Sequence, residues 1–63
     1  MFERNYYDFE ELVKVACDYC NVTVYNEDYS QIVALCYKYF WGNIYKPEFM
    51  EKINEIKERV NNE

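Results

Sequence analysis

Hydrophobic and polar positions follow the period of an α-helix in three segments of this chain, and the first segment is 8–20. Asp8, three residues before Glu11, has the form of a capping box, and Asn21 is suited to end the helix in a left-handed conformation. Charged residues occupy the opposite side of the helical wheel, so the pattern predicts an amphipathic helix. Its apolar face carries Phe9, Leu12, Val13, Ala16, Cys17 and Cys20.

The second segment, 28–41, is apolar on nearly all sides. Asn26 or Asp28 can cap its start, and Gly42 can end it in the left-handed conformation that glycine adopts without strain. A helix that is apolar all round is either central in a fold or in contact with a partner. One stripe consists of Tyr29, Ile32, Val33, Cys36, Tyr39 and Phe40, and the opposite face carries Ala34, Tyr37, Lys38 and Trp41.

The third segment, 47–60, has the clearest helical pattern. Pro47 suits the first turn, and Glu48 favours the positive end of the helix dipole. Glu55 and Arg59 are spaced as an i,i+4 ion pair on the solvent side. The buried face is predicted to carry Phe49, Ile53, Ile56 and Val60.

Short connections between three helices predict antiparallel neighbours, and hence a compact all-α three-helix bundle. No repeat or linker divides the chain, so we expect one helical domain over residues 1–63. The β-branched stretch at 22–25 and the N-terminal residues 2–7 are candidates for short extended pieces.

The length and the net charge of the chain limit the classes of function that it can have. A core built from 63 residues supplies only about 3 to 5 kcal/mol unless a staple or a second copy adds to it. The net charge of -5 comes from the first half of the chain and disfavours direct contact with nucleic acids or anionic membranes. The sequence contains no stretch typical of a signal peptide or a membrane span, so we expect a cytoplasmic protein with reduced thiols.

Cys17 and Cys20 have the C-x-x-C spacing of zinc and redox sites. A structural zinc site needs four ligands, and with Cys36 and no histidine this chain offers three, so zinc would have to be shared across a dimer. A redox pair would be expected at a helix N-terminus, not at the end of the helix. We favour the interpretation that all three are small apolar core residues, with no metal and no cofactor.

The residue types present in the chain also disfavour an enzymatic function. The absence of histidine removes the commonest general base, and a single glycine rules out a glycine-rich phosphate loop. Neighbouring carboxylates such as Glu10 and Glu11 diverge on a helix and do not converge on one substrate atom. We therefore expect a protein that is not an enzyme.

Acidic and aromatic residues are the remaining candidates for function. Acidic side chains near helix N-termini stabilise those helices, but they can also dock on a basic protein surface. The 13 aromatic residues exceed what three short helices can bury, and exposed tyrosine and tryptophan are typical of interfaces. Tyr37 and Trp41 are candidates for a dimer or second contact. The predicted partner-binding residues are Glu10, Glu11, Asp18, Tyr25, Glu27, Asp28 and Tyr29.

Small size, acidity, many tyrosines and a composition typical of AT-rich genomes resemble the phage-encoded inhibitors that include anti-CRISPR proteins and DNA mimics. The resemblance rests on the whole chain and transfers no residue roles. It implies an inhibitor that blocks the DNA-binding groove of a Cas nuclease in the host cytoplasm. Two alternatives remain: a homodimeric helical module that pairs through Tyr37 and Trp41, and a transcriptional regulator, which the glutamates of the third helix disfavour.

Overall fold

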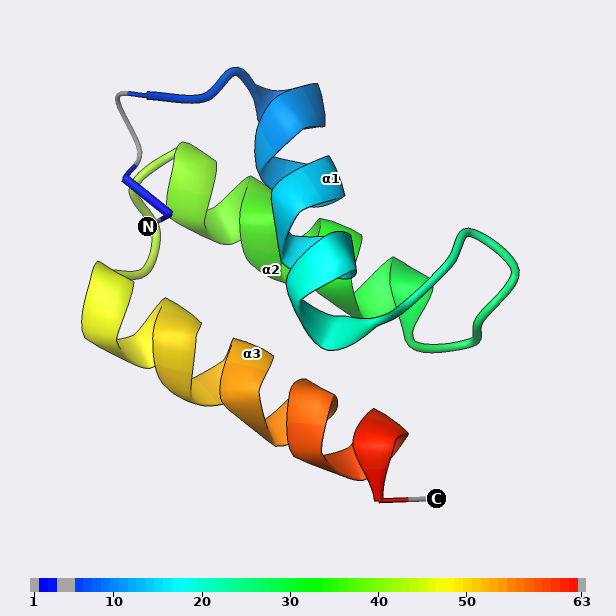
Figure 1. The fold of residues 1–63 in the computed structure, drawn as a ribbon. Coiled ribbons are helices and arrows are strands. Elements are labelled where there is room, and N and C mark those ends of the chain that lie inside the picture. The colour runs from blue at the N-terminus through cyan, green and yellow to red at the C-terminus, as the bar shows by residue number, and fades with distance from the viewer. Residues whose placement is uncertain (1, 4–5, 63) are drawn as a thin grey trace.

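The computed structural model describes residues 2–3 and 6–62, which form three mutually contacting helices (Figure 1). The helices are α1 (Phe9–Cys20), α2 (Tyr29–Phe40) and α3 (Lys46–Asn61). The predicted all-α three-helix arrangement is confirmed, with helix bounds within one residue of those predicted. No strand occurs among the described residues: 22–25 forms a loop and turn, and of the segment 2–7 residues 4–5 lie outside the described part.

The two helix starts confirm one cap and correct the other. At α1, the Asp8 carboxylate accepts a hydrogen bond of 2.8 Å from the Glu11 amide, as the capping box predicts. At α2, Asp28 occupies the capping position but makes no side-chain cap. The Asn26 side chain instead accepts a 2.8 Å bond from the Asp28 amide and shapes the turn before the helix.

Both predicted stop signals act as expected. Asn21 (φ 59°) and Gly42 (φ 78°) are left-handed at the ends of α1 and α2. The next amide then donates back into the last turn, from Val22 to the Cys17 carbonyl (2.9 Å) and from Asn43 to the Lys38 carbonyl (2.8 Å). The first of these bonds also brings Val22 into the core.

The core lies where the three apolar faces meet. It contains the predicted central positions of each helix, together with Phe2 and Val22, which the helical pattern does not predict. The Tyr39 ring stacks on Phe49 with 4.4 Å between centroids. The buried residues are Phe2, Leu12, Val13, Ala16, Cys20, Val22, Ile32, Cys36, Tyr39, Phe49, Ile53 and Ile56.

Phe2 anchors the N-terminal residues to the bundle. Its fully buried ring makes edge contacts with Tyr19 (5.3 Å) and Phe49 (5.7 Å), and its carbonyl accepts a 2.7 Å hydrogen bond from the Tyr39 hydroxyl. The described N-terminal residues therefore lie beside the connection between α2 and α3 (Figure 1). Phe2 has φ 62°, which costs about 1–3 kcal/mol for a bulky residue, so its buried contacts must exceed that cost.

Polar contacts close the seam between α1 and α3 at the surface. The Tyr19 hydroxyl donates a 2.6 Å hydrogen bond to Asn54, and the Lys57 ammonium lies 4.1 Å from the centre of the Tyr19 ring. At the end of α1, Asn21 donates to Asn61 at 3.0 Å. These contacts tie the end of α1 to α3.

Candidate protein-binding surfaces

An apolar depression lies between α1, the loop that follows it and the start of α2. It has a volume of about 330 Å³, and its rim carries the carboxylates of Glu10 and Asp18 with Lys14 between them. We call this depression the α1 groove. Its lining residues are Glu10, Val13, Lys14, Cys17, Asp18, Val22, Thr23, Val24 and Tyr29.

A second depression, of about 460 Å³, continues the α1 groove toward α2 and adds Glu27 and Val33 to the surface. Val24 and Tyr29 line both depressions, so the two form one continuous surface. Along this surface, apolar side chains make up the floor and three carboxylates lie at the edge. Such a surface suits a partner that is basic and partly apolar.

The helical repeat of α1 and the turn after it produce this arrangement. Glu10, Lys14 and Asp18 follow one another at four-residue intervals, so they form one row on the surface of α1. The left-handed Asn21 then turns the chain back, and the buried Val22 closes the end of the groove. Sequence periodicity could place the row of charges, but the groove depends on the turn.

The loop over residues 22–28 presents apolar side chains to solvent. Tyr25 is 94% exposed and Val24 is 66% exposed, although the loop is held by turn hydrogen bonds from Asn26 to Thr23 and from Tyr29 to Asn26, both 3.0 Å. The loop extends from one end of the molecule (Figure 1). An ordered loop that exposes a tyrosine and a valine is a strong candidate for a contact.

The structure divides the predicted partner-binding residues into two groups. Glu10, Asp18, Glu27 and Tyr29 surround the continuous groove, and Tyr25 is exposed on the adjoining loop. Glu11 is exposed on α1 but does not line the groove.

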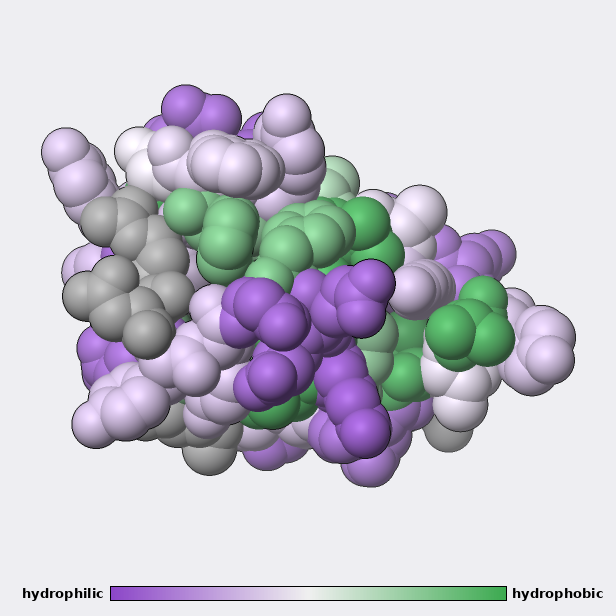
Figure 2. All heavy atoms as spheres, turned by 90° about the horizontal axis from the view of Figure 1, so that it is seen from above, coloured by the Kyte–Doolittle hydropathy of each residue, from purple (hydrophilic) through white to green (hydrophobic). Residues whose placement is uncertain are grey.

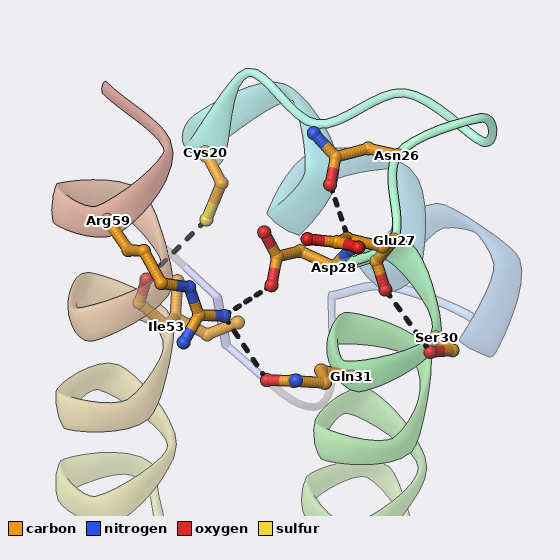
Figure 3. Close-up of polar contacts among 8 residues, drawn as sticks. All are labelled: Cys20, Asn26, Glu27, Asp28, Ser30, Gln31, Ile53 and Arg59. Carbon is orange, nitrogen blue, oxygen red and sulfur yellow. Dashed lines mark hydrogen bonds and ion pairs between the residues drawn. The ribbon is translucent and has the colours of Figure 1, made fainter. Parts of the chain in front are cut away.

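Asp28, the remaining predicted residue, lies in an internal contact. Its carboxylate pairs with the Arg59 guanidinium, and its side chain is only 13% exposed. Arg59 also contacts the Gln31 side chain at 3.4 Å, which ties the loop, α2 and α3 together (Figure 3). The ion pair predicted between Glu55 and Arg59 is therefore replaced by one between Arg59 of α3 and Asp28, the residue that precedes α2. Sequence spacing favours pairs within one helix and gives no signal for this one.

A second candidate surface consists of four aromatic side chains near the start of α1 and the end of α2. Phe9 makes edge contacts with Tyr37 (6.2 Å) and Phe40 (5.9 Å), and Trp41 does so with Tyr37 (6.2 Å) and Phe40 (5.1 Å). Tyr37 remains 55% exposed and Trp41 62% exposed. We call Phe9, Tyr37, Phe40 and Trp41 the aromatic patch.

Hydrophobic and hydrophilic groups are sharply separated on one face of the molecule. Seen from above, a band of hydrophobic side chains lies next to a cluster of strongly hydrophilic ones (Figure 2). Another hydrophobic group lies at the end of the molecule from which the 22–28 loop extends (Figure 2). Apolar groups that border strongly hydrophilic groups in this way are typical of protein interfaces.

The three cysteines are in environments that suppress their reactivity. Burial raises the pKa of Cys20 to about 11 and that of Cys36 to about 12. Their thiols donate to the carbonyls of Ile53 (3.5 Å) and Leu12 (3.9 Å) inside the core. Cys17 is half-buried in the α1 groove, and burial followed by the charge of Asp18 raises its pKa. Fully buried thiols cannot meet ligands from a second copy, which supports the core interpretation of Cys20 and Cys36.

Residues 2–3 and 6–62 contain neither a metal-binding cluster nor a membrane-spanning helix. No group of three or more metal-ligating side chains is placed to hold an ion. No helix in this part of the chain combines the length and the apolar character needed to cross a bilayer. Comparison with known proteins found no family model, no curated protein and no solved structure that matches. The α1 groove and the aromatic patch are therefore the features that indicate a function.

Proposed function

We propose that the protein is a non-enzymatic inhibitor that binds a basic surface of another protein through the α1 groove. One observation carries this proposal: the α1 groove and the depression that continues it have an apolar floor edged by Glu10, Asp18 and Glu27, and no ion pair with a described cation occupies any of the three. Glu10 and Asp18 are exposed on a helix and Glu27 on a loop held by turn hydrogen bonds, so their carboxylates can meet arginines and lysines with little rearrangement.

The proposed target is the DNA-binding groove of a Cas nuclease, as in anti-CRISPR proteins, within the cytoplasm of the host cell. A groove that binds DNA presents arginine and lysine side chains to phosphates, and the row of α1 carboxylates offers them an alternative. The net charge of -5 speeds the encounter with such a groove. Inhibition then results from competition with DNA.

The carboxylates and the tyrosines of this surface have different effects on binding. Glu10, Asp18 and Glu27 affect the association rate and its dependence on salt, because charges at a rim act at long range. Tyr25, which is almost fully exposed, and the half-buried Tyr29 supply area that becomes buried in the complex and slow dissociation. The inhibitor should therefore associate more slowly at high salt and dissociate at a nearly constant rate.

The proposal is tested by a gel-shift competition in which purified Cas nucleases bind labelled DNA with increasing inhibitor. The triple variant Glu10→Lys, Asp18→Lys, Glu27→Lys should lose at least about tenfold in potency, since several charge contacts become repulsive. The matched control is Glu48→Lys, Glu51→Lys, Glu58→Lys, which changes the same charge on exposed positions of α3. Equal potency of the wild type and the groove variant would overturn the proposal.

The aromatic patch favours a second candidate, a homodimeric interaction module. Tyr37 and Trp41 expose more than half of their surface although they pack against two phenylalanines, which leaves a large apolar area that a second copy can cover. In sedimentation velocity at micromolar concentration, Tyr37→Ala with Trp41→Ala should convert a dimer into a monomer. Tyr6→Ala with Tyr45→Ala, at positions 80% and 79% exposed, is the control and should remain dimeric. A monomeric wild type removes this candidate.

A further inference from the structure

A separate groove of about 250 Å³ lies between α2 and α3, and its lining shares no residue with the surfaces described above. Its floor is apolar, with Ala34 and Leu35 from α2 and Ile56 from α3, and charged side chains stand along both edges. We call it the α2/α3 groove. Its lining residues are Gln31, Ala34, Leu35, Lys38, Lys52, Glu55, Ile56 and Arg59.

The charge of the α2/α3 groove is opposite to that of the whole chain. Lys38, Lys52 and Arg59 are three of the chain's seven basic residues, and Glu55 is the one acidic residue in the lining. Asp28, which is not part of the lining, pairs with Arg59, and the groove stays positive with both carboxylates counted. The α1 groove has two carboxylates and one lysine in its lining, so the two grooves have charges of opposite sign. A cationic groove in an acidic protein attracts anionic groups that the remaining surface repels.

Arg59 is held in position at one end of this groove. Its Nη2 atom makes both contacts, with the Asp28 carboxylate and with the Gln31 side chain at 3.4 Å (Figure 3). Its Nε and Nη1 atoms take part in neither contact, and 49% of the side chain is exposed. An arginine fixed by two neighbours loses little side-chain entropy when it binds a further anion.

We propose that the α2/α3 groove binds an acidic amphipathic peptide segment of a partner protein. In this complex, an apolar side chain of the segment lies on the floor between Leu35 and Ile56, and flanking carboxylates meet Lys38, Lys52 and Arg59. Charge complementarity selects carboxylates, and the apolar floor selects a segment that also carries leucine-like side chains. This site is independent of the proposed function of the α1 groove.

Two features favour a peptide over other anions. The volume of about 250 Å³ is below the roughly 300 Å³ at which pockets for whole small molecules begin, but it is sufficient for one side chain of a larger partner. A nucleic-acid backbone has no apolar side chain to place on the floor, so it would gain nothing from Ala34, Leu35 and Ile56.

The test is a titration of the ¹⁵N-labelled protein with the synthetic peptide acetyl-EELLEE-amide, followed by NMR chemical shifts. The amides of Leu35, Lys38, Lys52 and Ile56 should shift together. The variant Lys38→Gln, Lys52→Gln should weaken binding at least about tenfold, because two charge-assisted contacts are lost. The variant Lys14→Gln, Lys57→Gln removes the same charge outside the groove and should bind as the wild type does.

Ligand controls on the wild-type protein keep the test independent of how the variants fold. The peptide acetyl-QQLLQQ-amide should shift the same amides much less, which would show that carboxylates are recognised. The oligonucleotide (dT)12 should leave them unchanged. The proposal is overturned if acetyl-EELLEE-amide does not shift these amides, if the uncharged peptide binds equally well, or if (dT)12 shifts the same set.

Discussion

Two groups of four aromatic side chains in this protein both contain edge-to-face ring pairs but lie in different surroundings. The first group, Phe2, Tyr19, Tyr39 and Phe49, lies in and around the core, and the second is the aromatic patch. Edge-to-face pairs occur in both, at 5.3 Å between Phe2 and Tyr19 and at 5.1 Å between Phe40 and Trp41. Ring contacts alone therefore do not distinguish a structural cluster from a binding surface.

The two groups differ in the burial of their rings and in the hydrogen bonds of their tyrosine hydroxyls. In the core group, the Tyr39 hydroxyl donates to the Phe2 carbonyl and the Tyr19 hydroxyl donates to Asn54. In the aromatic patch, Tyr37 and Trp41 remain more than half exposed. The first group should therefore determine stability, and the second should be available to a partner.

Among the substitutions that test this comparison, Phe2→Ala should lower the free energy of unfolding the most. It removes a fully buried ring that contacts Tyr19 and Phe49, and replacing a buried phenylalanine with alanine costs about 3–5 kcal/mol. Alanine keeps a Cβ atom and is also strained in the left-handed conformation at residue 2, so the substitution does not recover the cost of that strain. Urea unfolding measures this decrease in the free energy of unfolding. A change below about 1 kcal/mol would show that the N-terminal residues do not belong to the core.

Tyr39→Phe should lower the free energy of unfolding by a smaller but measurable amount. It leaves the ring stacked on Phe49 and removes the hydroxyl that bonds the buried Phe2 carbonyl, so about 1–3 kcal/mol should be lost. Tyr37→Phe is the matched control, because it removes the same atom from an exposed ring and should change stability little. Equal effects of the two substitutions would contradict the division between the groups.

The helices and most of the core could be predicted from the sequence, because both depend on local signals. Asp8, Asn21 and Gly42 mark the start and the ends that the structure shows. Phe2 could not be predicted as a core residue, since it precedes the periodic segments and its position depends on contacts with α1, α2 and α3.

The candidate sites were only partly predictable. The charge row of Glu10 and Asp18 follows from helical spacing, and the exposure of Trp41 follows from its place on the back of the predicted helix. The α1 and α2/α3 grooves depend on how elements distant in the sequence meet, as does the contact of Asp28 with Arg59. Tertiary arrangement of this kind leaves no periodic signal in a single sequence.

Glu3→Gln should have a weaker effect than Tyr39→Phe. Glu3 pairs with Lys46 next to the Phe2 anchor, and the hydrogen bond from Lys46, followed by its charge, lowers the Glu3 pKa below the ordinary value of 4.5. A carboxyl with a lowered pKa stabilises the fold above its ordinary pKa and loses this effect as pH falls through the lowered value. The small difference between the variant and the wild type should be constant near neutral pH and vanish in acid. The same difference at all pH values would show that the charge of Glu3 is not responsible.

Trp41→Ala should have the smallest effect on stability, within about 0.5 kcal/mol, because a residue that is 62% exposed contributes little to the core. Trp41 is the chain's one tryptophan, so its fluorescence reports directly on the aromatic patch. In the monomeric protein, acrylamide should quench this fluorescence efficiently, and a second copy or partner that covers the patch should reduce the quenching. Tyr45→Ala, at a position 79% exposed and outside the patch, is the control and should leave this protection unchanged. A side chain kept for binding can be truncated with little effect on stability. If Trp41→Ala lowered the free energy of unfolding by more than about 1 kcal/mol, the aromatic patch would belong with the core group.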